Sequence, residues 1–184
     1  MKKQATLFAI IVIFLVNTQD LLSQSTMTMN FGIEAFAPVG SWSNNLYIAG
    51  AGLDFSMNYF LNNKTSLGVN SGFKYLLVDN KVRDISDDYF AYFIPVHLQS
   101  NYFLSGNYKE GGIFSQVQGG VNVFKIESKT SGIEQNTSET NPTFSVGIGF
   151  QDKRRFQYIL RYHSILNDSN NLNYLAFNLG FNFY

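Results

Sequence analysis

The sequence predicts an all-β protein, an eight-stranded antiparallel up-and-down β-barrel that spans a membrane. Apolar residues alternate with small or polar residues in eight stretches of the 184-residue chain, which is the side-chain period of a β-strand. The connections between the stretches are alternately long and short, as in barrels with loops on one side of a membrane and tight turns on the other. The apolar faces carry no charge, as a lipid-facing surface requires.

The last stretch, residues 173–184, shows this pattern most clearly. Its apolar face consists of Leu175, Phe177, Leu179, Phe181 and Phe183. A soluble protein would need a second sheet to cover this face, whereas a membrane barrel exposes it to lipid and pairs the last strand with the first. We expect the other seven strands at residues 27–35, 46–60, 67–77, 92–104, 113–123, 144–150 and 156–163.

The long connections are predicted at residues 38–45 around Trp42, 79–88, 127–142 and 167–171. The third is rich in Ser, Thr, Asn and Glu, and Ile133 is its only sizeable apolar residue. It cannot bury enough apolar surface to offset its ordering entropy, so we expect a mobile loop outside the membrane. Within the fourth strand, Pro95 lacks the N–H that a sheet ladder needs, which predicts a local bulge.

The composition excludes several classes of function. Charged residues make up 14% of the chain, and 13 basic residues balance 13 acidic ones, so there is no electrostatic case for nucleic acid. The chain has no Cys. This excludes disulfides, thiolate metal sites, a Cys nucleophile and a lipoprotein anchor.

The first residues have the features of an export signal. Lys2 and Lys3 precede an apolar run at residues 7–16, which is too short to span a bilayer comfortably. We therefore expect residues 1–23 to be a signal peptide and residues 24–184 to be one barrel domain in the outer membrane. The alternative for the apolar run is a retained membrane anchor.

A soluble, secreted barrel of the lipocalin type is the alternative architecture. Its apolar face would point inward, and its polar face would meet water and carry many charges. In this sequence the polar faces consist mainly of Gly, Ser, Asn and Gln, with few charges. That composition favours a crowded barrel lumen.

Six titratable residues are predicted at similar depth on the lumen face. They are Glu34, Asp54, Lys74, His97, Arg161 and His163. An eight-stranded barrel is just wide enough for side chains to fill, and buried charges must be paired. We expect these residues to form an internal charge network that plugs the lumen. A proton relay or a ligand site is the alternative.

Charged residues in the predicted loops are the candidates for surface contacts. They are Asp84, Asp87, Asp88, Lys129 and Glu134. The three aspartates could hold a divalent cation among lipopolysaccharide phosphates, but they lack the spacing of an EF-hand. A solvated charged loop is the simpler interpretation, so we predict no metal site.

Two stretches carry a resemblance to a known family. Residues 93–98, Phe-Ile-Pro-Val-His-Leu, resemble a segment of exported barrels, and residues 161–168 followed by 175–183 resemble their last hairpin. The chain thus resembles the small outer-membrane β-barrel family of the OmpX and OmpA-transmembrane-domain type. The resemblance implies insertion by the barrel-assembly machinery, which recognises a final aromatic residue in phase with the lipid face. Phe183 is in phase and Tyr184 lies one residue beyond, so either Phe183 serves or a bulge restores the phase.

An enzyme that modifies lipid A is the alternative function, because several small barrels of this membrane are enzymes. Deacylases of this architecture carry a His-x-Ser pair, whose spacing places base and nucleophile on one strand face. Here His163 and Ser164 are adjacent, and no Glu follows Glu139 to orient the imidazole. We therefore predict no catalytic residues.

The sequence as a whole predicts a non-enzymatic integral outer-membrane β-barrel protein with a side-chain-filled lumen. Surface binding, envelope structure and a place in a larger surface machine are the roles left open. The expected partners are outer-membrane lipid and lipopolysaccharide, the barrel-assembly machinery during insertion, and an unknown surface partner. No cofactor and no nucleic acid are expected.

Overall fold

The computed structural model describes residues 27–40, 47–78, 88–130, 133–167 and 171–183. The predicted signal peptide, Trp42, Asp84, Asp87 and Tyr184 lie outside these ranges. No helix in the described part of the chain is long and apolar enough to cross a membrane.

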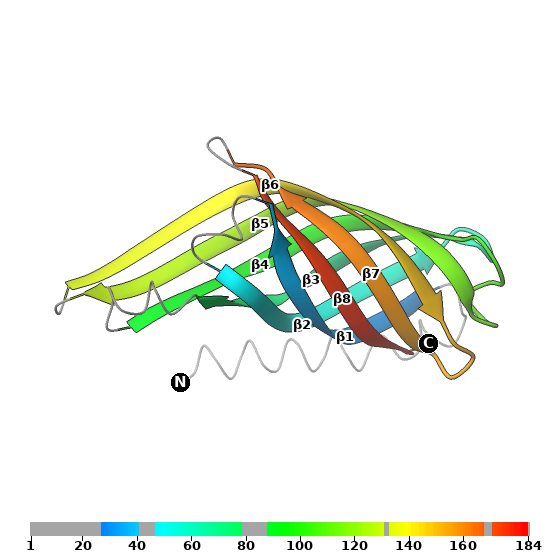
Figure 1. Ribbon diagram of the computed structural model, residues 1–184. Helices are drawn as coiled ribbons and strands as arrows, with labels where there is room; N and C mark the ends of the chain where they lie inside the picture. The colour runs from blue at the N-terminus through cyan, green and yellow to red at the C-terminus, as the bar shows by residue number, and fades with distance from the viewer. Residues whose placement is uncertain (1–26, 41–46, 79–87, 131–132, 168–170, 184) are drawn as a thin grey trace, which may run out of the picture.

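The described residues form eight strands that close into one barrel (Figure 1). The strands are β1 Met27–Val39, β2 Tyr47–Phe60, β3 Thr65–Val78, β4 Asp88–Phe103, β5 Gly112–Thr130, β6 Ile133–Gln151, β7 Phe156–Ile165 and β8 Leu172–Phe183. Each strand pairs antiparallel with the next, and β8 pairs with β1. The predicted fold class is confirmed.

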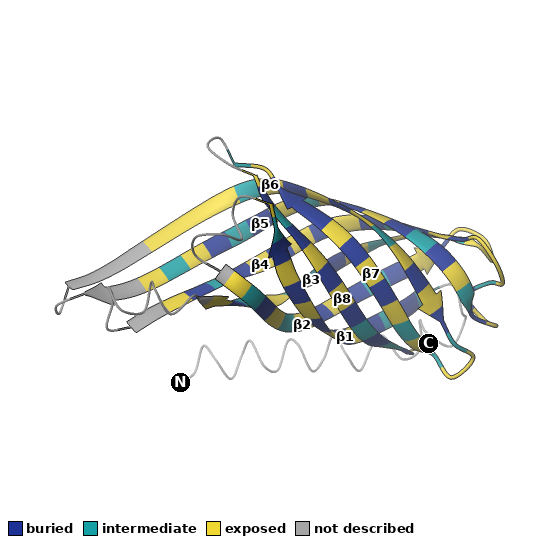
Figure 2. Cartoon of the chain, in the orientation of Figure 1, coloured by how far each residue is buried: buried dark blue, intermediate teal, exposed yellow. Residues whose placement is uncertain are grey.

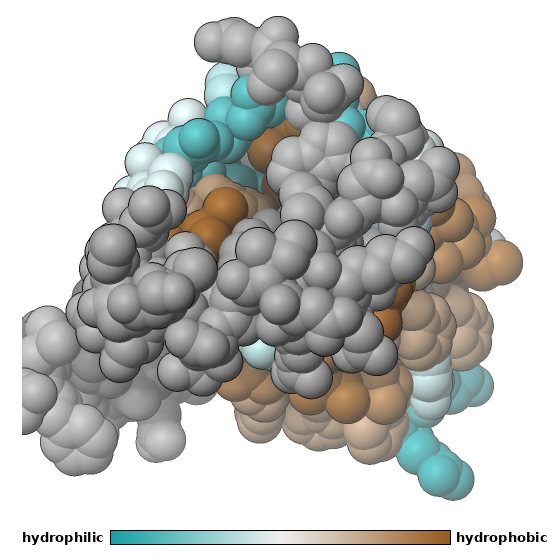
Figure 3. Space-filling model, turned by 60° about the vertical axis from the view of Figure 1, so that its left-hand side comes forward, coloured by the Kyte–Doolittle hydropathy of each residue, from teal (hydrophilic) through white to brown (hydrophobic). Residues whose placement is uncertain are grey.

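Buried and exposed side chains alternate along most of the described strand positions, between the barrel interior and its outer wall (Figure 2). Ile33 on the outer wall is 57% exposed, whereas the next residue, Glu34, is 2% exposed. The exposed side chains of the wall are apolar, and Figure 3 shows apolar surface over much of the wall on its right and lower sides. A soluble lipocalin-type barrel would have the reverse arrangement, so the outer wall is that of a barrel embedded in lipid.

Tight turns join the strands at one end of the barrel, here called the turn end. After β2, the Asn62 side chain accepts hydrogen bonds from the backbone N–H groups of Lys64 and Thr65 at 2.8 and 2.9 Å. After β4, the turn folds back so that the Tyr108 ring stacks on Phe60, with ring centroids 4.1 Å apart. Tyr108 is buried, so this turn closes part of the barrel mouth.

The opposite end differs from the prediction. The composition of residues 127–142 predicts a loop, but β5 and β6 pair without interruption from Gly112↔Gln151 to Thr130↔Ile133. We call residues 124–142 the projecting hairpin, because β5 and β6 extend beyond the barrel together with the start of β4 (Figure 1). Asp88, Lys129 and Glu134 therefore lie in strands, and the loop prediction was wrong. The barrel fixes the register of both strands, so ladder hydrogen bonds and pairs of β-branched residues such as Val123–Thr140 and Ile126–Thr137 continue the sheet without a large apolar face.

The bulge predicted at Pro95 was also wrong. The β3–β4 register is the same on both sides of the proline, from Lys74↔Phe93 to Ser71↔Val96, and only the ladder pairs between them are missing. The Ser71 hydroxyl donates a hydrogen bond of 2.8 Å to the Pro95 carbonyl. A side-chain bond thus supports the place where proline interrupts the ladder.

The barrel interior has apolar clusters near both ends and polar residues between them. The hairpin-end cluster consists of Phe36, Leu76, Ala91, Phe93, Phe124, Ile165, Leu172, Tyr174 and Ala176. The turn-end cluster consists of Phe60, Phe103, Tyr108, Phe114 and Ile159. The polar residues between these clusters form the candidate site.

Candidate functional site

Four of the six predicted lumen residues meet in the middle of the barrel. We call Glu34 of β1, Asp54 of β2, Lys74 of β3 and Arg161 of β7 the charge quartet. Each is at most 3% exposed. Strand alternation alone places each of them on the interior face, and the closed sheet then brings β7 across β8 to β1 and β2.

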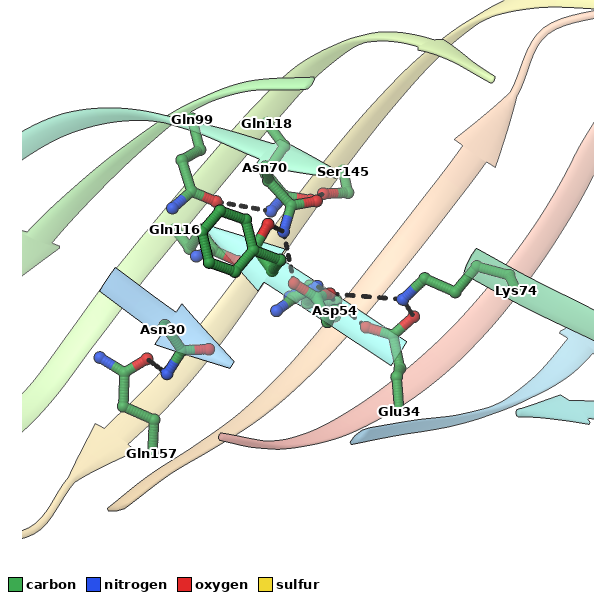
Figure 4. A network of polar contacts seen from close by, with 12 residues as sticks. Asn30, Glu34, Asp54, Asn70, Lys74, Gln99, Gln116, Gln118, Ser145 and Gln157 are labelled. Carbon is green, nitrogen blue, oxygen red and sulfur yellow. Dashed lines mark hydrogen bonds and ion pairs between the residues drawn. The ribbon is translucent and has the colours of Figure 1, made fainter. Parts of the chain in front are cut away.

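Each base of the quartet contacts both acids. Arg161 Nη1 lies 2.9 Å from Glu34 Oε2 and 2.8 Å from Asp54 Oδ2. Lys74 Nζ lies 3.3 Å from Asp54 Oδ2 and is also bonded to Glu34 (Figure 4). Asn70 donates a further hydrogen bond to Asp54. Two acids and two bases balance, so the middle of the lumen is neutral as a unit.

Two glycines give the long basic side chains their paths along the barrel wall. Gly52 pairs with Lys74, and a Cβ at Gly52 would lie 2.8 Å from Lys74 Cδ. Gly147 pairs with Arg161, and a Cβ there would lie 2.9 Å from Arg161 Cγ. Both approaches are too close for any larger residue without a shift. The sequence therefore places glycine where each base must lie flat against the neighbouring strand.

The two histidines lie beside the quartet and are not bonded to it. The ring centroids of His97 and His163 are 6.3 Å apart. His163 stacks on Tyr174 with a centroid distance of 4.5 Å and an interplanar angle of 8°. No hydrogen-bond partner for their ring nitrogens is found among the described residues. The structure thus divides the predicted six-residue network into a bonded quartet and a separate imidazole pair.

Toward the turn end, buried amides satisfy one another. Gln118 Nε2 donates to Gln99 Oε1 at 2.9 Å, and Ser145 Oγ donates to Gln118 Oε1 at 2.8 Å. Figure 4 shows these bonds together with the bond from Asn70 to Asp54 of the quartet. A second set joins Asn30 and Asn182 at 3.0 Å. This half of the lumen is filled by side chains that leave few polar atoms unpaired.

The apolar clusters differ from what the sequence predicts. The sequence predicts polar interior faces because most of their residues are Gly, Ser, Asn or Gln. Strand phase could have identified the exceptions, since Phe36 shares the face of Glu34, and Phe93 shares the face of His97. Both rings are buried inside the barrel. The inward-facing position of Phe36 and Phe93 on their strands, rather than their residue type, therefore places both rings inside the barrel.

On one edge of the projecting hairpin, β6 has no partner among the described strands. The pairing of β6 with β7 ends at Thr143↔Ile165, so among the described strands only β5 pairs with residues 133–141. Exposed residues on the hairpin include Lys125, Glu127 and Ser138, which line a shallow hollow of about 180 Å³. The register opposes Asp88 to Lys129 and Lys129 to Glu134. The three loop candidates that the structure describes are thus brought together on neighbouring strands.

The described residues show no constellation for metal or nucleophilic chemistry. They contain no group of three or more His, Cys, Asp or Glu side chains that could hold a metal ion. His163 and Ser164 are consecutive in β7, so their side chains leave opposite faces of the strand. The described interior holds two buried acids and two buried bases in mutual contact.

A closed eight-stranded barrel with an apolar outer wall and a filled interior defines a small transmembrane β-barrel of the outer-membrane class. No protein-family model matches the sequence, and no curated protein matches it. Solved structures with the same fold include Ail of Yersinia pestis, with a TM-score of 0.60 and 13% identity over 85% of this chain and 97% of that one. Neisserial surface protein A gives a TM-score of 0.56 and 8% identity, over 86% of this chain and 96% of that one. The N-terminal barrel of Pseudomonas aeruginosa OprF gives a TM-score of 0.55 and 14% identity, over 86% of this chain and 98% of that one.

Proposed function

We propose that this protein is a non-enzymatic outer-membrane barrel that binds an extended segment of a surface partner along the free edge of β6. The observation that carries the proposal is that no described strand pairs with residues 133–141 on the side of β6 away from β5. An exposed strand edge offers a row of N–H and C=O groups to an added strand, and main-chain hydrogen bonds then supply affinity.

The rest of the molecule supports this role. The apolar wall anchors the barrel in membrane lipid, and the charge quartet and apolar clusters fill its interior. In barrels of this class the short turns face the periplasm, so the projecting hairpin would extend from the cell surface past the lipopolysaccharide. The barrel-assembly machinery would act on the chain only during insertion.

The charges of the hairpin bear on the kind of partner. Ail of Yersinia pestis has been solved in complex with the heparin analogue sucrose octasulfate. Residues 124–142 of this chain contain two lysines and three glutamates, so they do not form a basic surface for a sulfated ligand. The free backbone edge favours an extended peptide instead.

The backbone N–H groups that point toward the open edge of β6 can be identified, which makes the proposal testable. Pro142 O accepts a hydrogen bond of 2.8 Å from Leu166 N, so the carbonyl of Pro142 faces the side of β6 away from β5, which is the side without a described partner strand at residues 133–141. Because main-chain groups alternate along a strand, Ser138 also directs its N–H toward the open edge. Ser138→Pro therefore removes an edge donor and leaves the β5–β6 ladder intact, and Ser138→Ala changes the side chain alone.

The experiment selects random peptides displayed on phage against the barrel in lipid nanodiscs. A variant with a shortened hairpin serves for counter-selection. Selected peptides should bind wild type and Ser138→Ala alike and bind Ser138→Pro at least tenfold more weakly. Equal binding to all three proteins would show that the edge is not the binding element.

A further inference from the structure

The three turns at the turn end lie against one another (Figure 1). Tyr108 N donates a hydrogen bond of 3.3 Å to Asn63 O, which joins the turn after β4 to the turn after β2. Gln151 Nε2 donates to Tyr108 O at 2.8 Å, which joins the turn after β4 to the end of β6 and its turn. Residues 61–64, 104–111 and 152–155 therefore form one surface, here called the turn surface.

The turn surface has an excess of positive charge. Its basic residues are Lys64, Lys109, Lys153, Arg154 and Arg155, and its acidic residues are Glu110 and Asp152. Each acid accepts a hydrogen bond from its own turn region. Glu110 Oε2 accepts from Asn107 Nδ2 at 2.9 Å, and Asp152 Oδ1 accepts from the backbone N–H of Phe156 at 2.9 Å. The two acids thus help to fix the turns in place.

The basic side chains of this surface are available to a partner. Lys64, Lys109, Lys153 and Arg154 are exposed, and none of the four forms an ion pair with a described acid. The projecting hairpin has the opposite balance, with two lysines and three glutamates in residues 124–142. A surface that served solubility alone would mix both signs. The separation of charge between the two ends therefore indicates an anionic partner at the turn end.

The turn after β6 holds three of the bases in a fixed arrangement. Arg155 N donates to Asp152 O at 3.1 Å, and Asn182 N of β8 donates to Arg155 O at 3.0 Å. Arg155 has a φ of 75°, and it is the only residue other than glycine with a positive φ in the described part of the chain. Glycine suits this left-handed conformation best. The turn therefore carries an arginine where the backbone favours glycine, which indicates a role for the side chain.

The bases lie just beyond the apolar outer wall. The exposed side chains of Leu61, Leu104 and Phe156 belong to or adjoin the three turns, and in a bilayer such side chains meet acyl chains. Lys and Arg side chains that flank an apolar surface extend their charged groups to the level of the lipid headgroups. This depth favours a lipid phosphate over a soluble partner as the anion that the turn surface binds.

We infer that the turn surface binds the phosphate groups of anionic phospholipids in the leaflet that it faces. With the short turns in the periplasm, this is the periplasmic leaflet of the outer membrane. The guanidinium groups of Arg154 and Arg155 match the geometry of phosphate oxygens, and the lysines add point charges. The site is at the opposite end of the barrel from the open edge of β6, so it holds the barrel in the membrane independently of a surface partner.

The test is native mass spectrometry of the intact barrel released from nanodiscs that contain equal amounts of phosphatidylglycerol and phosphatidylcholine. The two lipids are used with the same acyl chains, so a difference in retention reports the headgroup. Wild type should retain at least threefold more phosphatidylglycerol than phosphatidylcholine. The ratio should fall when the nanodiscs are prepared at high salt, because salt screens exposed charges.

Two matched variants locate the site. Lys153→Gln with Arg154→Gln removes two exposed bases from the turn surface and should lower the ratio at least twofold. Lys125→Gln with Lys129→Gln removes two bases from the projecting hairpin and should leave the ratio unchanged. Arg155→Gly gives an independent readout, because it removes a base at a position whose backbone suits glycine, and it should also lower the ratio.

The outcomes separate a headgroup site from its alternatives. Equal retention of the two lipids by wild type would overturn the inference, and so would a ratio that falls only in the hairpin variant or in neither variant. Inorganic phosphate, added at the concentration of the lipid phosphate, should not displace phosphatidylglycerol. Displacement by inorganic phosphate would show a site for the free anion and would contradict a membrane headgroup as the ligand.

Discussion

Arg161 of β7 bonds directly to Glu34 of β1 across the interior of the barrel, with Nη1 2.9 Å from Oε2, although 127 residues separate them in the chain. The same nitrogen lies 2.8 Å from Asp54 Oδ2. One guanidinium therefore links the first two strands to the seventh, through a pairing that only the closed barrel makes.

Removing this guanidinium should destabilise the barrel strongly. Arg161→Ala leaves Glu34 and Asp54 with one cation between them in a buried site, and breaking such a pair costs about 3–5 kcal/mol. Urea unfolding in detergent micelles measures the loss. Arg154→Ala, in an exposed turn, is the matched control and should change the free energy of unfolding by less than about 0.5 kcal/mol.

A double variant tests whether the contact between Arg161 and Glu34 contributes to the free energy of unfolding. Glu34→Ala together with Arg161→Ala should cost less than the sum of the single changes, because the double variant removes both partners of the pair and strands neither. Strict additivity would mean that the two groups do not interact in the folded barrel.

The lumen should not conduct ions as a porin does. The charge quartet occupies its middle, and apolar clusters lie near both ends. An eight-stranded barrel has little interior beyond what its side chains fill. Planar-bilayer recordings of the pure protein should show no stable conductance. Large, steady channels would contradict the filled interior.

Glycine at position 52 should be required for the path of Lys74. A Cβ at Gly52 would lie 2.2 Å from the Phe73 carbonyl oxygen and 2.8 Å from Lys74 Cδ. Gly52→Ala should therefore destabilise the barrel by about 1–3 kcal/mol through overpacking. Gly119→Ala is the control, because nothing lies within 4 Å of a Cβ there, and it should be neutral in the same unfolding measurement. Equal effects of the two changes would show that the space beside Lys74 can relax.

The projecting hairpin should be dispensable for folding. Phe124 pairs with Glu139, and alternation from Pro142 makes this a hydrogen-bonded pair of the β5–β6 ladder, so joining these two residues through a two-residue Asn-Gly turn keeps the remaining register. The shortened protein should still resist detergent and migrate anomalously on gels until it is boiled. A loss of this heat-modifiable folding would mean that the hairpin contributes to barrel formation.

Protease digestion tests which end of the barrel faces outward. Lys125 is exposed on the projecting hairpin, whereas Lys64 and Lys153 are exposed at the turn end. Trypsin added to intact cells should cut at Lys125 and leave both turns uncut. First cleavage at Lys64 or Lys153 would invert the proposed topology.

Several features of this protein follow from the sequence by itself. Strand alternation has a period of two, so the sequence alone places Glu34, Asp54, Lys74 and Arg161 on one interior face. The same alternation identifies the uncharged outer face and hence the membrane. These are local properties, because each depends only on residues one or two positions apart.

The tertiary structure decided the contacts that depend on which strands lie side by side. Which acid meets which base follows from the register of strands that close around the barrel, and that register cannot be read from the spacing of Arg161 and Glu34 in the chain. The polar residues of the projecting hairpin become strands because the barrel below holds β5 and β6 in register, which composition alone does not reveal. Phe93 and Tyr174 are buried because the narrow interior leaves their strand face no solvent, so closure of the sheet outweighs the residue type.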